Sequence, residues 1–262
     1  MTSSIWIFIL TGAMLVAFSC AWLFGKKINN YSLVDAVWAG GIGLVGATWL
    51  LFGTASFPKR IAALVILVFW SFRLTKHLAT RIYRTHPEED SRYQELRSQW
   101  KPHVAAWFFG FFQLQAISTI LLALPFYFVA FGTTGSWGAF ESMGLGIAVI
   151  GIVGEATADH QLSVFKQGDP DPKSICKNGL WNYSRHPNYF FEAVIWLGFY
   201  LFACGSDWGW TTLHAPAIIT FLLLKVTGIP PSEKSSLARK GDAYRRYQES
   251  TSAFIPLPPK HP

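Results

Sequence analysis

The stretch SIWIFILTGAMLVAFSCAWLF, at residues 4–24, contains no charged side chain. A helix of about twenty apolar residues crosses the hydrocarbon core of a bilayer, which is about 30 Å thick. In water the same helix would expose apolar side chains around its whole circumference. The stretch therefore predicts a transmembrane helix, and it sets the class of protein to which the rest of the chain belongs.

Six further apolar runs follow the first one. Only 14% of the 262 residues are charged, and 51% are hydrophobic, whereas a soluble domain carries roughly 25% charged residues. The sequence predicts an all-α integral membrane protein, with seven transmembrane helices in a bundle and one domain over residues 1–262. The further spans are expected near residues 35–53, 61–78, 104–132, 140–158, 188–204 and 211–229.

The lysines and arginines predict how these spans are oriented. With seven spans, every lysine and arginine except Lys59 and Arg60 falls on the same side of the membrane. Because basic loops stay in the cytoplasm, the N-terminus is expected outside and the C-terminus in the cytoplasm. The net charge of +7 follows from this topology, so no nucleic-acid partner is expected. We expect a multi-pass protein of the bacterial inner (cytoplasmic) membrane.

Two kinds of site are disfavoured by the sequence. The three cysteines, Cys20, Cys176 and Cys204, lie far apart without metal-ligand spacing, so neither a disulfide framework nor a metal site is expected. The glycine-rich motifs of soluble nucleotide-binding folds are missing as well. A nucleotide would have to be held within the helix bundle.

The segment GLWNYSRHPNYFFE, at residues 179–192, places polar groups at the start of the sixth apolar run. Such groups lose solvation in a bilayer unless something polar lies against them. A large, anionic, hydrogen-bonding cofactor is the simplest such partner. The candidate cofactor-binding residues in this segment are Arg185, His186, Asn188, Tyr189 and Glu192.

Two carboxylates of the preceding span have the same spacing as Asn188 and Glu192. Glu155 and Asp159 are four residues apart and share a helix face. Two interpretations are open: an interfacial pair matched to lysines of the next loop, or acceptors for ribose hydroxyls or a carboxamide. Asn188 likewise fits an N-cap, an interpretation that leaves Glu192 unexplained.

The N-terminal half holds further candidates. Asp35 opens the second span, and Arg73 lies near the end of the third. These two residues either pair with each other or face a cofactor. Arg84 follows in the next loop, where it is either a solvated surface charge or a phosphate ligand that uses its planar fork of donors.

The chain resembles the steroid 5-alpha-reductase family, in its bacterial branch labelled as a domain of unknown function. The resemblance rests on VDAVWAGG at 34–41, FWSFRLTKHL at 69–78, GLWNYSRHPNYFFEAVIW at 179–196 and YRRYQESTSAFIP at 244–256. The last two motifs are also similar to those of isoprenylcysteine and phospholipid methyltransferases, which use S-adenosylmethionine. The seven expected spans favour the reductase.

The resemblance implies NADPH as the cofactor. Asp159, Asn188 and Glu192 fall at positions that line its pocket, and Arg84 and Lys166 at positions of its phosphate ligands. Arg185 and His186 have no counterpart in the animal enzymes and are candidates by charge and location. Trp70 stands where those enzymes carry a substrate-binding tyrosine. The full set of candidate cofactor-binding residues is Arg73, Arg84, Glu155, Asp159, Lys166, Arg185, His186, Asn188, Tyr189, Glu192, Tyr244 and Tyr247.

The reaction that the resemblance implies is reduction of a C=C bond conjugated to a carbonyl, in a steroid-like or other lipophilic substrate. Such a reaction belongs to steroid or lipid metabolism and needs a group that stabilises the developing enolate and supplies a proton. The candidates for this catalytic role are Asp35, Tyr31 and Glu192. The alternative is an S-adenosylmethionine-dependent methyltransferase acting on a lipid or prenyl acceptor. In both cases we expect a monomer that contacts membrane lipid.

Overall fold

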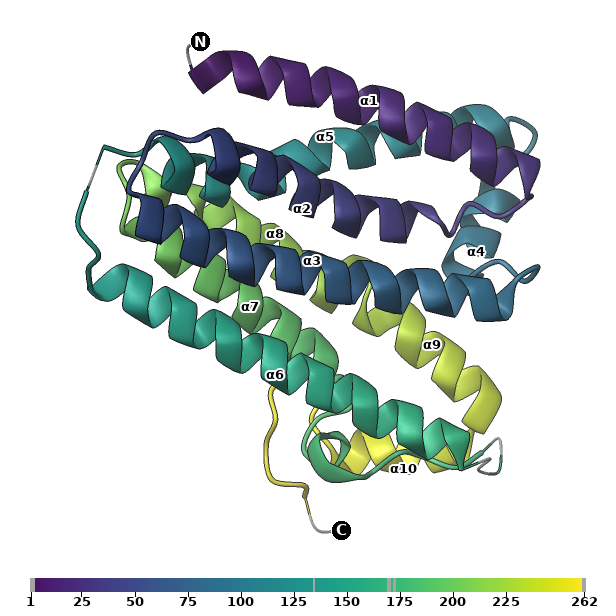
Figure 1. Ribbon diagram of the computed structural model, residues 1–262. Coiled ribbons are helices and arrows are strands. Elements are labelled where there is room, and N and C mark those ends of the chain that lie inside the picture. The colour runs from purple at the N-terminus through teal and green to yellow at the C-terminus, as the bar shows by residue number, and fades with distance from the viewer. Residues whose placement is uncertain (1–2, 134, 169–170, 172, 261–262) are drawn as a thin grey trace. The chain divides into compact units, whose positions relative to one another are not determined.

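The computed structural model describes residues 3–133, 135–168, 171 and 173–260, and most of these residues lie in helices (Figure 1). Its α-helices are α1 Ser3–Lys27, α2 Val34–Phe52, α3 Phe57–Thr85, α4 Ser91–Gln99, α5 Val104–Phe131, α6 Ala139–Gln167, α7 Pro187–Cys204, α8 His214–Phe221, α9 Ile229–Lys240 and α10 Asp242–Ser250. Short 3-10 segments, η1 Gly179–Asn182 and η2 Gly209–Leu213, and a π-helical turn, η3 Leu222–Val226, connect some of them. Within the described residues the sole β-type pairing is an isolated bridge between Ser184 and Ser252. The prediction of an all-α protein is confirmed.

Six helical segments among the described residues are long and apolar enough to cross a membrane. They are Ser4–Lys27, Val34–Phe52, Phe57–Thr85, Val104–Phe131, Ala139–Gln167 and Gly209–Lys240. The run expected at 188–204 does form a helix, α7, but that helix is not among the six. Asn188 and Glu192 in its first two turns lower its apolar character. The count of seven spans and the orientation of the termini stay predictions.

The chain divides into two compact units. Unit 1 comprises Met1–Ser142 and Leu201–Ala215, and unit 2 comprises Met143–Tyr200 and Pro216–Pro262. The helices α6, α7 and α8 each begin in one unit and end in the other. The prediction of a single domain over residues 1–262 stays a prediction, and each unit is described by itself.

Unit 1 is built around α2, which packs against both α3 and α5, while α1 packs against α5 and α2 (Figure 1). Glycines let α2 approach α3 closely, because a Cβ atom at Gly43 would lie 2.1 Å from the Ser71 hydroxyl oxygen. That hydroxyl donates to the carbonyl of Ala39, 2.9 Å away, and so ties the two helices together. Trp49 of α2 and Trp70 of α3 are fully buried and belong to the core of this unit.

A buried ion pair closes one end of the α2–α3 hairpin. The Lys59 ammonium lies 2.6 Å from the Glu141 carboxylate, and their side chains are only 1% and 2% exposed. Lys59 also donates to the carbonyl of Gly205 at 3.0 Å, and Glu141 accepts from the amide of Gly138 at 2.9 Å. Lys59 was expected in the loop before the third span; in the structure it joins the starts of α3 and α6 to the loop after α7.

Unit 2 contains most of α6 packed against most of α7. Both helices carry glycines at the contact: a Cβ at Gly154 would lie 2.3 Å from the ring of Phe191, and one at Gly198 would lie 2.5 Å from the backbone of Ala148. Small residues at a helix contact allow the backbones to come close together. The close approach brings the polar residues of the two helices into reach of one another.

Two helices run further than the sequence predicts. The third expected span ended at residue 78, whereas α3 continues to Thr85, and the fifth ended at 158, whereas α6 continues to Gln167. Apolar run length locates the part of a helix that lies in lipid, and it does not mark where the helix ends. Both extensions carry a basic residue in their last turn, Arg84 and Lys166. The helix dipole stabilises positive charge at this end of a helix.

Candidate functional site

The segment before α7 is fastened to the C-terminal tail of unit 2. The amide of Arg185 donates to the carbonyl of Ser252 at 2.8 Å, and the Ser184 hydroxyl donates to the carbonyl of Phe254 at 2.8 Å. The Tyr247 hydroxyl donates to the carbonyls of Trp181 and Ser184. Burial raises the pKa of Tyr247, so its phenol keeps the proton that it donates. The SRHP and FIP motifs therefore meet in space, and together they fix the start of α7.

Arg185 is the centre of this attachment. Its guanidinium lies 2.7 Å from the Glu233 carboxylate and also donates to the backbone carbonyls of Gln248, at 3.0 Å, and Thr251, at 2.5 Å. His186 lies 3.4 Å from the same carboxylate. The structure thus places Arg185 and His186 together and gives both of them partners within the chain. We name the set Ser184, Arg185, His186, Glu233 and Tyr247 the helix-mouth anchor.

Glu233 was missed by sequence reasoning. It is the single acidic residue between Asp207 and Asp242, in a stretch where the other charges are basic. A lone carboxylate of that kind is a signal for a specific partner, but the sequence does not say which arginine pairs with it.

Polar residues of α6 and α7 form a second group in unit 2. The Asn188 amide donates to the Asp159 carboxylate at 3.3 Å, and the Trp196 indole donates to the Glu192 carboxylate at 2.9 Å. Glu155 and Glu192 are only 5% and 8% exposed. Asn188 also accepts from the amide of Tyr189, the next residue, at 3.1 Å. Because Asn188 is the second residue of α7 and an N-cap accepts from an amide two or three residues further on, the N-cap interpretation does not describe it. We name Glu155, Asp159, Asn188 and Glu192 the α6–α7 polar group.

The remaining predicted residues of unit 2 surround these two groups. The Tyr189 ring stacks on that of His186, with centroids 5.3 Å apart, and the Tyr244 ring packs edge-on against Tyr247. Burial raises the pKa of the Cys176 thiol, while the positive charges of Lys240 and Lys166 oppose the rise. Lys166 therefore lies in a basic neighbourhood near the end of α6, where an anion would be attracted.

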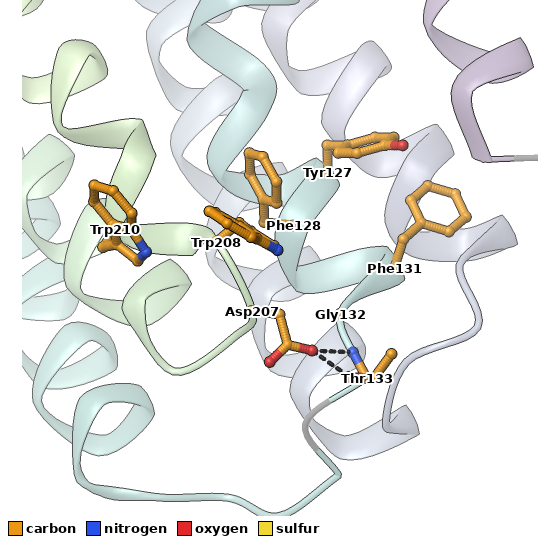
Figure 2. Close-up of a pocket in the computed structure, with 8 residues that line it drawn as sticks. All are labelled: Tyr127, Phe128, Phe131, Gly132, Thr133, Asp207, Trp208 and Trp210. Atoms are coloured by element: carbon orange, nitrogen blue, oxygen red, sulfur yellow. Dashed lines mark hydrogen bonds between the residues drawn. The ribbon is translucent and has the colours of Figure 1, made fainter.

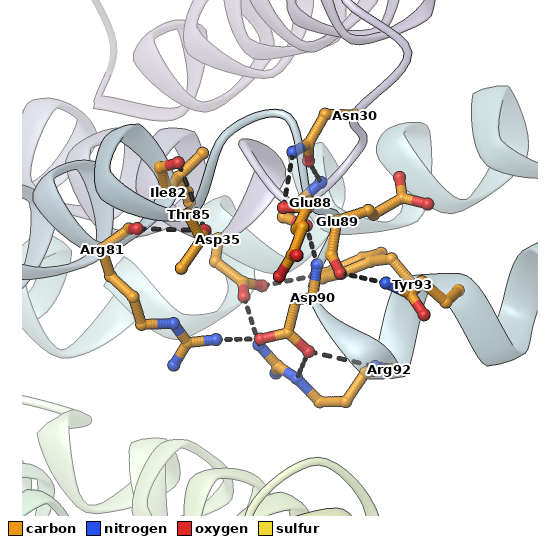
Figure 3. Close-up of polar contacts among 12 residues, drawn as sticks. Asn30, Asp35, Arg81, Ile82, Thr85, Glu88, Glu89, Asp90, Arg92 and Tyr93 are labelled. Carbon is orange, nitrogen blue, oxygen red and sulfur yellow. Dashed lines mark hydrogen bonds and ion pairs between the residues drawn. The ribbon is translucent and has the colours of Figure 1, made fainter.

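In unit 1, Asp35 lies in a network of charges at the other end of the α2–α3 hairpin (Figure 3). Its carboxylate accepts from Arg92 at 2.7 Å and from the Tyr93 hydroxyl at 2.5 Å. Asp90 caps α4, accepts from Arg92 at 3.0 Å and pairs with Arg81. We name Asp35, Arg81, Asp90, Arg92 and Tyr93 the loop clamp. It borders a small cleft of about 110 Å³.

The electrostatics of the loop clamp follow from these contacts. Burial by itself would raise the pKa of Asp90, but the hydrogen bonds and charge of Arg92 and the charge of Arg81 outweigh it and hold the pKa below its usual value. Burial opposes the charged form of Arg92, yet the Asp35 and Asp90 carboxylates raise its pKa. Burial and the charge of Asp35 raise the pKa of Tyr93. The clamp is therefore ionised at its Asp90–Arg92 pair and neutral at its phenol near neutral pH.

The other predicted residues of unit 1 are Tyr31, Arg73 and Arg84, and the amide of Tyr31 donates to the Glu89 carboxylate at 2.6 Å, next to the loop clamp. The Tyr31 ring stacks on Phe108 with centroids 4.0 Å apart, and it is 3% exposed. Arg73 is half-buried in α3, and Arg84 is exposed in its last turn. Asp35, for which Arg73 was one expected partner, bonds to Arg92 and Tyr93. Residues so distant along the chain give no pairing signal in a single sequence.

The fold and these polar groups define a class: a multi-pass helical membrane protein with buried polar residues along its apolar helices. The chain belongs to the family described as "Protein of unknown function (DUF1295)", which matches residues 21–251. It is also similar to a Schizosaccharomyces pombe protein described as "Uncharacterized protein C594.04c", with 29% identity over an alignment that covers 87% of this chain and 73% of that protein. No solved structure matches the chain. Neither description names an activity.

Proposed function

We propose that this protein is an NADPH-dependent membrane reductase acting on a C=C bond conjugated to a carbonyl, in a steroid-like or other lipophilic substrate. The observation that carries the proposal is the α6–α7 polar group. Asp159 and Asn188 are hydrogen-bonded to each other, and buried Glu155 and Glu192 accompany them on the same two apolar helices. Ionisable residues in transmembrane segments are costly and mark functional sites by default.

The residues of unit 2 fit the chemistry of the cofactor. Carboxylates and an amide accept hydrogen bonds, and the nicotinamide carboxamide and ribose hydroxyls donate them. Lys166, next to Lys240 in a basic neighbourhood, suits a phosphate. Glu192, Asn188 and Asp159 are proposed to hold the nicotinamide half, and Lys166 the 2′-phosphate. Arg84, in unit 1, stays a candidate phosphate ligand that the resemblance implies. The basic residues favour NADPH over NADH, because a 2′-phosphate needs cationic donors.

The helix-mouth anchor has a different proposed role. Arg185 uses its donors on a carboxylate and two backbone carbonyls of its own chain. Arg185, His186, Tyr189, Tyr244 and Tyr247 therefore support the proposal by holding the first turn of α7 in one position, so that Asn188 and Glu192 are presented in a fixed geometry. Preorganised groups of this kind lose little entropy when a ligand binds.

NADPH supplies a hydride when it is bound, and the chain must supply a proton and exclude water. Among the proposed donors, Tyr31 is buried outside the helices, and burial raises its pKa, so its phenol carries a proton at neutral pH. Asp35 accepts hydrogen bonds from Arg92 and Tyr93, an arrangement that suits a positioning role better than proton donation. Glu192 accepts from Trp196. Tyr31 is therefore the first choice for the donor.

The setting of this function is also proposed. We infer that α7 also crosses the membrane, as the sixth of seven spans, and that the N-terminus is outside and the C-terminus in the cytoplasm of a bacterial inner membrane, as the basic loops indicate. A lipophilic substrate then reaches the protein from lipid. The protein is proposed to act as a monomer.

Ligand-dependent stabilisation of the protein in nanodiscs tests the proposal. A ligand present at a hundred times its dissociation constant stabilises the folded state by about 2.7 kcal/mol. We expect NADPH to raise the melting temperature, NADH to raise it less, and S-adenosylmethionine to leave it unchanged. Stabilisation by S-adenosylmethionine with neither dinucleotide effective would assign the protein to the methyltransferases instead.

Two matched pairs of variants place the site. Asn188→Ala is expected to weaken NADPH binding by about 1–3 kcal/mol, the cost of leaving a buried polar partner unmatched, whereas Asn178→Ala changes an exposed asparagine of the same unit and should bind normally. Lys166→Met should weaken NADPH binding but not NADH binding, and Lys173→Met should weaken neither. Oxidation of NADPH on addition of a 3-oxo-Δ4-steroid, with the reduced steroid as product, completes the test.

A further inference from the structure

An aromatic cavity of about 600 Å³ lies in unit 1, between the end of α5 and the loop that leads into η2 (Figure 2). Small-molecule sites in proteins occupy roughly 300–1,000 Å³. The walls are five aromatic side chains, namely Tyr127, Phe128, Phe131, Trp208 and Trp210, and Asp207 lies at the edge. The proposed reductase function makes no use of this cavity.

The aromatic rings of the α5 wall are held by packing. The Tyr127 ring lies 5.0 Å from that of Phe131 and 5.6 Å from that of Phe128, and it packs edge-on against buried Trp49 at 5.3 Å. Rings that are braced on several sides keep one orientation. Their faces and edges therefore form a fixed surface.

Trp208 has an unusual backbone conformation. Its φ of +62° is in the left-handed region, where a bulky residue is strained and glycine is favoured. The following residue has to be glycine, because a Cβ at Gly209 would lie 1.7 Å from the carbonyl oxygen of Ala203. The indole is 64% exposed, so burial of the ring does not explain why a tryptophan occupies this position.

The charge of the cavity is negative. Among the described residues that line it, Asp207 is the only charged one. Its carboxylate accepts from the Thr133 amide at 2.8 Å and from the Thr133 hydroxyl (Figure 2), and these bonds fix it beside the aromatic walls. A cation in this cavity would be attracted by the negative charge of the carboxylate and also by the quadrupoles of the aromatic rings.

We propose that this cavity binds an organic ammonium ion, either as a free solute or as the ammonium headgroup of a lipid. A metal cation is disfavoured because the walls offer aromatic carbon rather than oxygen ligands. A neutral sugar also stacks on tryptophan, but it needs more polar partners than Asp207, Thr133 and the edges of the Tyr127, Trp208 and Trp210 rings provide. A bare aromatic belt of the membrane interface would show no preference for charge.

Binding of radiolabelled choline to the protein in phosphatidylglycerol nanodiscs tests the proposal. We expect saturable binding that is displaced by unlabelled choline and not by 3,3-dimethylbutanol, a neutral molecule of the same shape. Nanodiscs made with phosphatidylcholine or phosphatidylethanolamine separate the two sources: loss of choline binding there identifies the lipid headgroup as the occupant, and unchanged binding identifies a free solute.

Two variants and a control locate the site. Asp207→Asn keeps an acceptor for Thr133 and removes the charge, and Trp208→Leu removes one aromatic face. Each is expected to weaken choline binding about two- to fivefold, the effect of one cation–π or ionic contact at an exposed site. Trp107→Leu, at another exposed tryptophan of unit 1, should bind choline as the unmodified protein does. All three should keep the melting temperature of the protein within a few degrees.

Several outcomes overturn the proposal. If unlabelled choline and 3,3-dimethylbutanol displaced radiolabelled choline equally, the cavity would be an apolar aromatic surface without preference for charge. Displacement by glucose or maltose alone would indicate a sugar site. Weakening of choline binding by Trp107→Leu, with Asp207→Asn unaffected, would move the site elsewhere. None of these results depends on whether NADPH binds.

Discussion

The two ends of the α2–α3 hairpin in unit 1 solve the same problem, a charged residue in a mostly apolar helix, in different ways. At one end, Lys59 and Glu141 form a pair with side chains 1% and 2% exposed. At the other end, Asp35 meets Arg92 with side chains 19% and 25% exposed. The first pair is closed to water, whereas the second opens onto a cleft.

The difference teaches what each charge contributes. When a buried ion pair loses one member, the other charge stays in a poorly solvated place without compensation. The free energy that this costs is larger than the net stability that the intact pair contributes. A partly exposed network can exchange its partners for water, so it contributes little to stability and remains adjustable. The dry end, with Lys59 and Glu141, is therefore the more sensitive to substitution, and the wet end, with Asp35 and Arg92, is the more adjustable.

Removing one member of the dry pair gives the largest expected effect. Lys59→Met leaves Glu141 buried without its cation and is expected to lower the free energy of unfolding by about 3–5 kcal/mol. The measurement is denaturant or thermal unfolding of the protein in one detergent. Lys101→Met, at an exposed lysine of the same unit, should change it by less than about 0.5 kcal/mol.

A second substitution checks the cause. If the cost of Lys59→Met comes from the stranded carboxylate, then Lys59→Met combined with Glu141→Leu should recover part of the lost stability. A double variant that is weaker than the single one would mean that Lys59 acts through its bond to Gly205 and through packing, and the contrast between the two ends would lose its basis.

Arg185 in unit 2 lies between these extremes, because its side chain is 9% exposed and that of Glu233 is 18% exposed. Arg185→Lys keeps the charge but cannot reach the carboxylate and both carbonyls together, so we expect a loss of about 1.5–3 kcal/mol, the range for hydrogen bonds to charged groups. Arg245→Lys is the matched control, because the side chains of Arg245 and its partner Asp242 are 67% and 87% exposed, and the variant should unfold as the unmodified protein does. Equal effects of the two changes would show that burial does not rank these arginines.

The apolar runs of the sequence predict where the helices lie, and the predicted bounds are accurate for helices that begin and end with an apolar run. The residues of α5 are Val104–Phe131 against an expected 104–132, and those of α7 are Pro187–Cys204 against 188–204. The prediction failed at the ends of α3 and α6, where the helix continues as a basic, amphipathic extension. There hydropathy stops reporting on backbone conformation.

The candidate site was predicted less completely, for a physical reason. Asp159, Asn188 and Glu192 were found because polar residues in apolar helices are visible in the sequence, and the structure joins the first two directly. The partners of Asp35 and Arg185 were not found, because pairing across dozens of residues depends on tertiary packing. Lys59 was taken for a loop charge since a single sequence does not indicate burial.

The effect of pH on the loop clamp is the next largest. The pKa of Asp90 is lowered from its ordinary value of 3.8, so the unfolded chain binds this proton more readily than the folded one. The stability that Asp90 contributes, up to about 1 kcal/mol for a partly exposed pair, is fully present above the unfolded pKa and is lost as the pH falls through the folded pKa. Asp90→Asn keeps the helix cap and removes the charge. The variant should therefore be less stable than the unmodified protein at pH 6, and the difference should shrink toward zero in acid.

The smallest effect is expected at Asp35, the residue that the comparison identifies as adjustable. Asp35→Asn removes the charge and leaves one amide oxygen, which can still accept from Arg92. The Tyr93 hydroxyl, which donates to the other carboxylate oxygen, can turn to accept from the new amide N–H, so the loss should be about 0.5 kcal/mol. Because the pair is partly exposed, added salt should screen the interaction and bring variant and unmodified protein together. Unfolding midpoints measured at low and high salt decide this, with Asp242→Asn as an exposed control. A loss of several kcal/mol that persists in high salt would place Asp35 in the same category as Lys59. A small, salt-sensitive loss of stability accompanied by a large loss of NADPH-dependent reduction would instead separate its structural role from its proposed catalytic one.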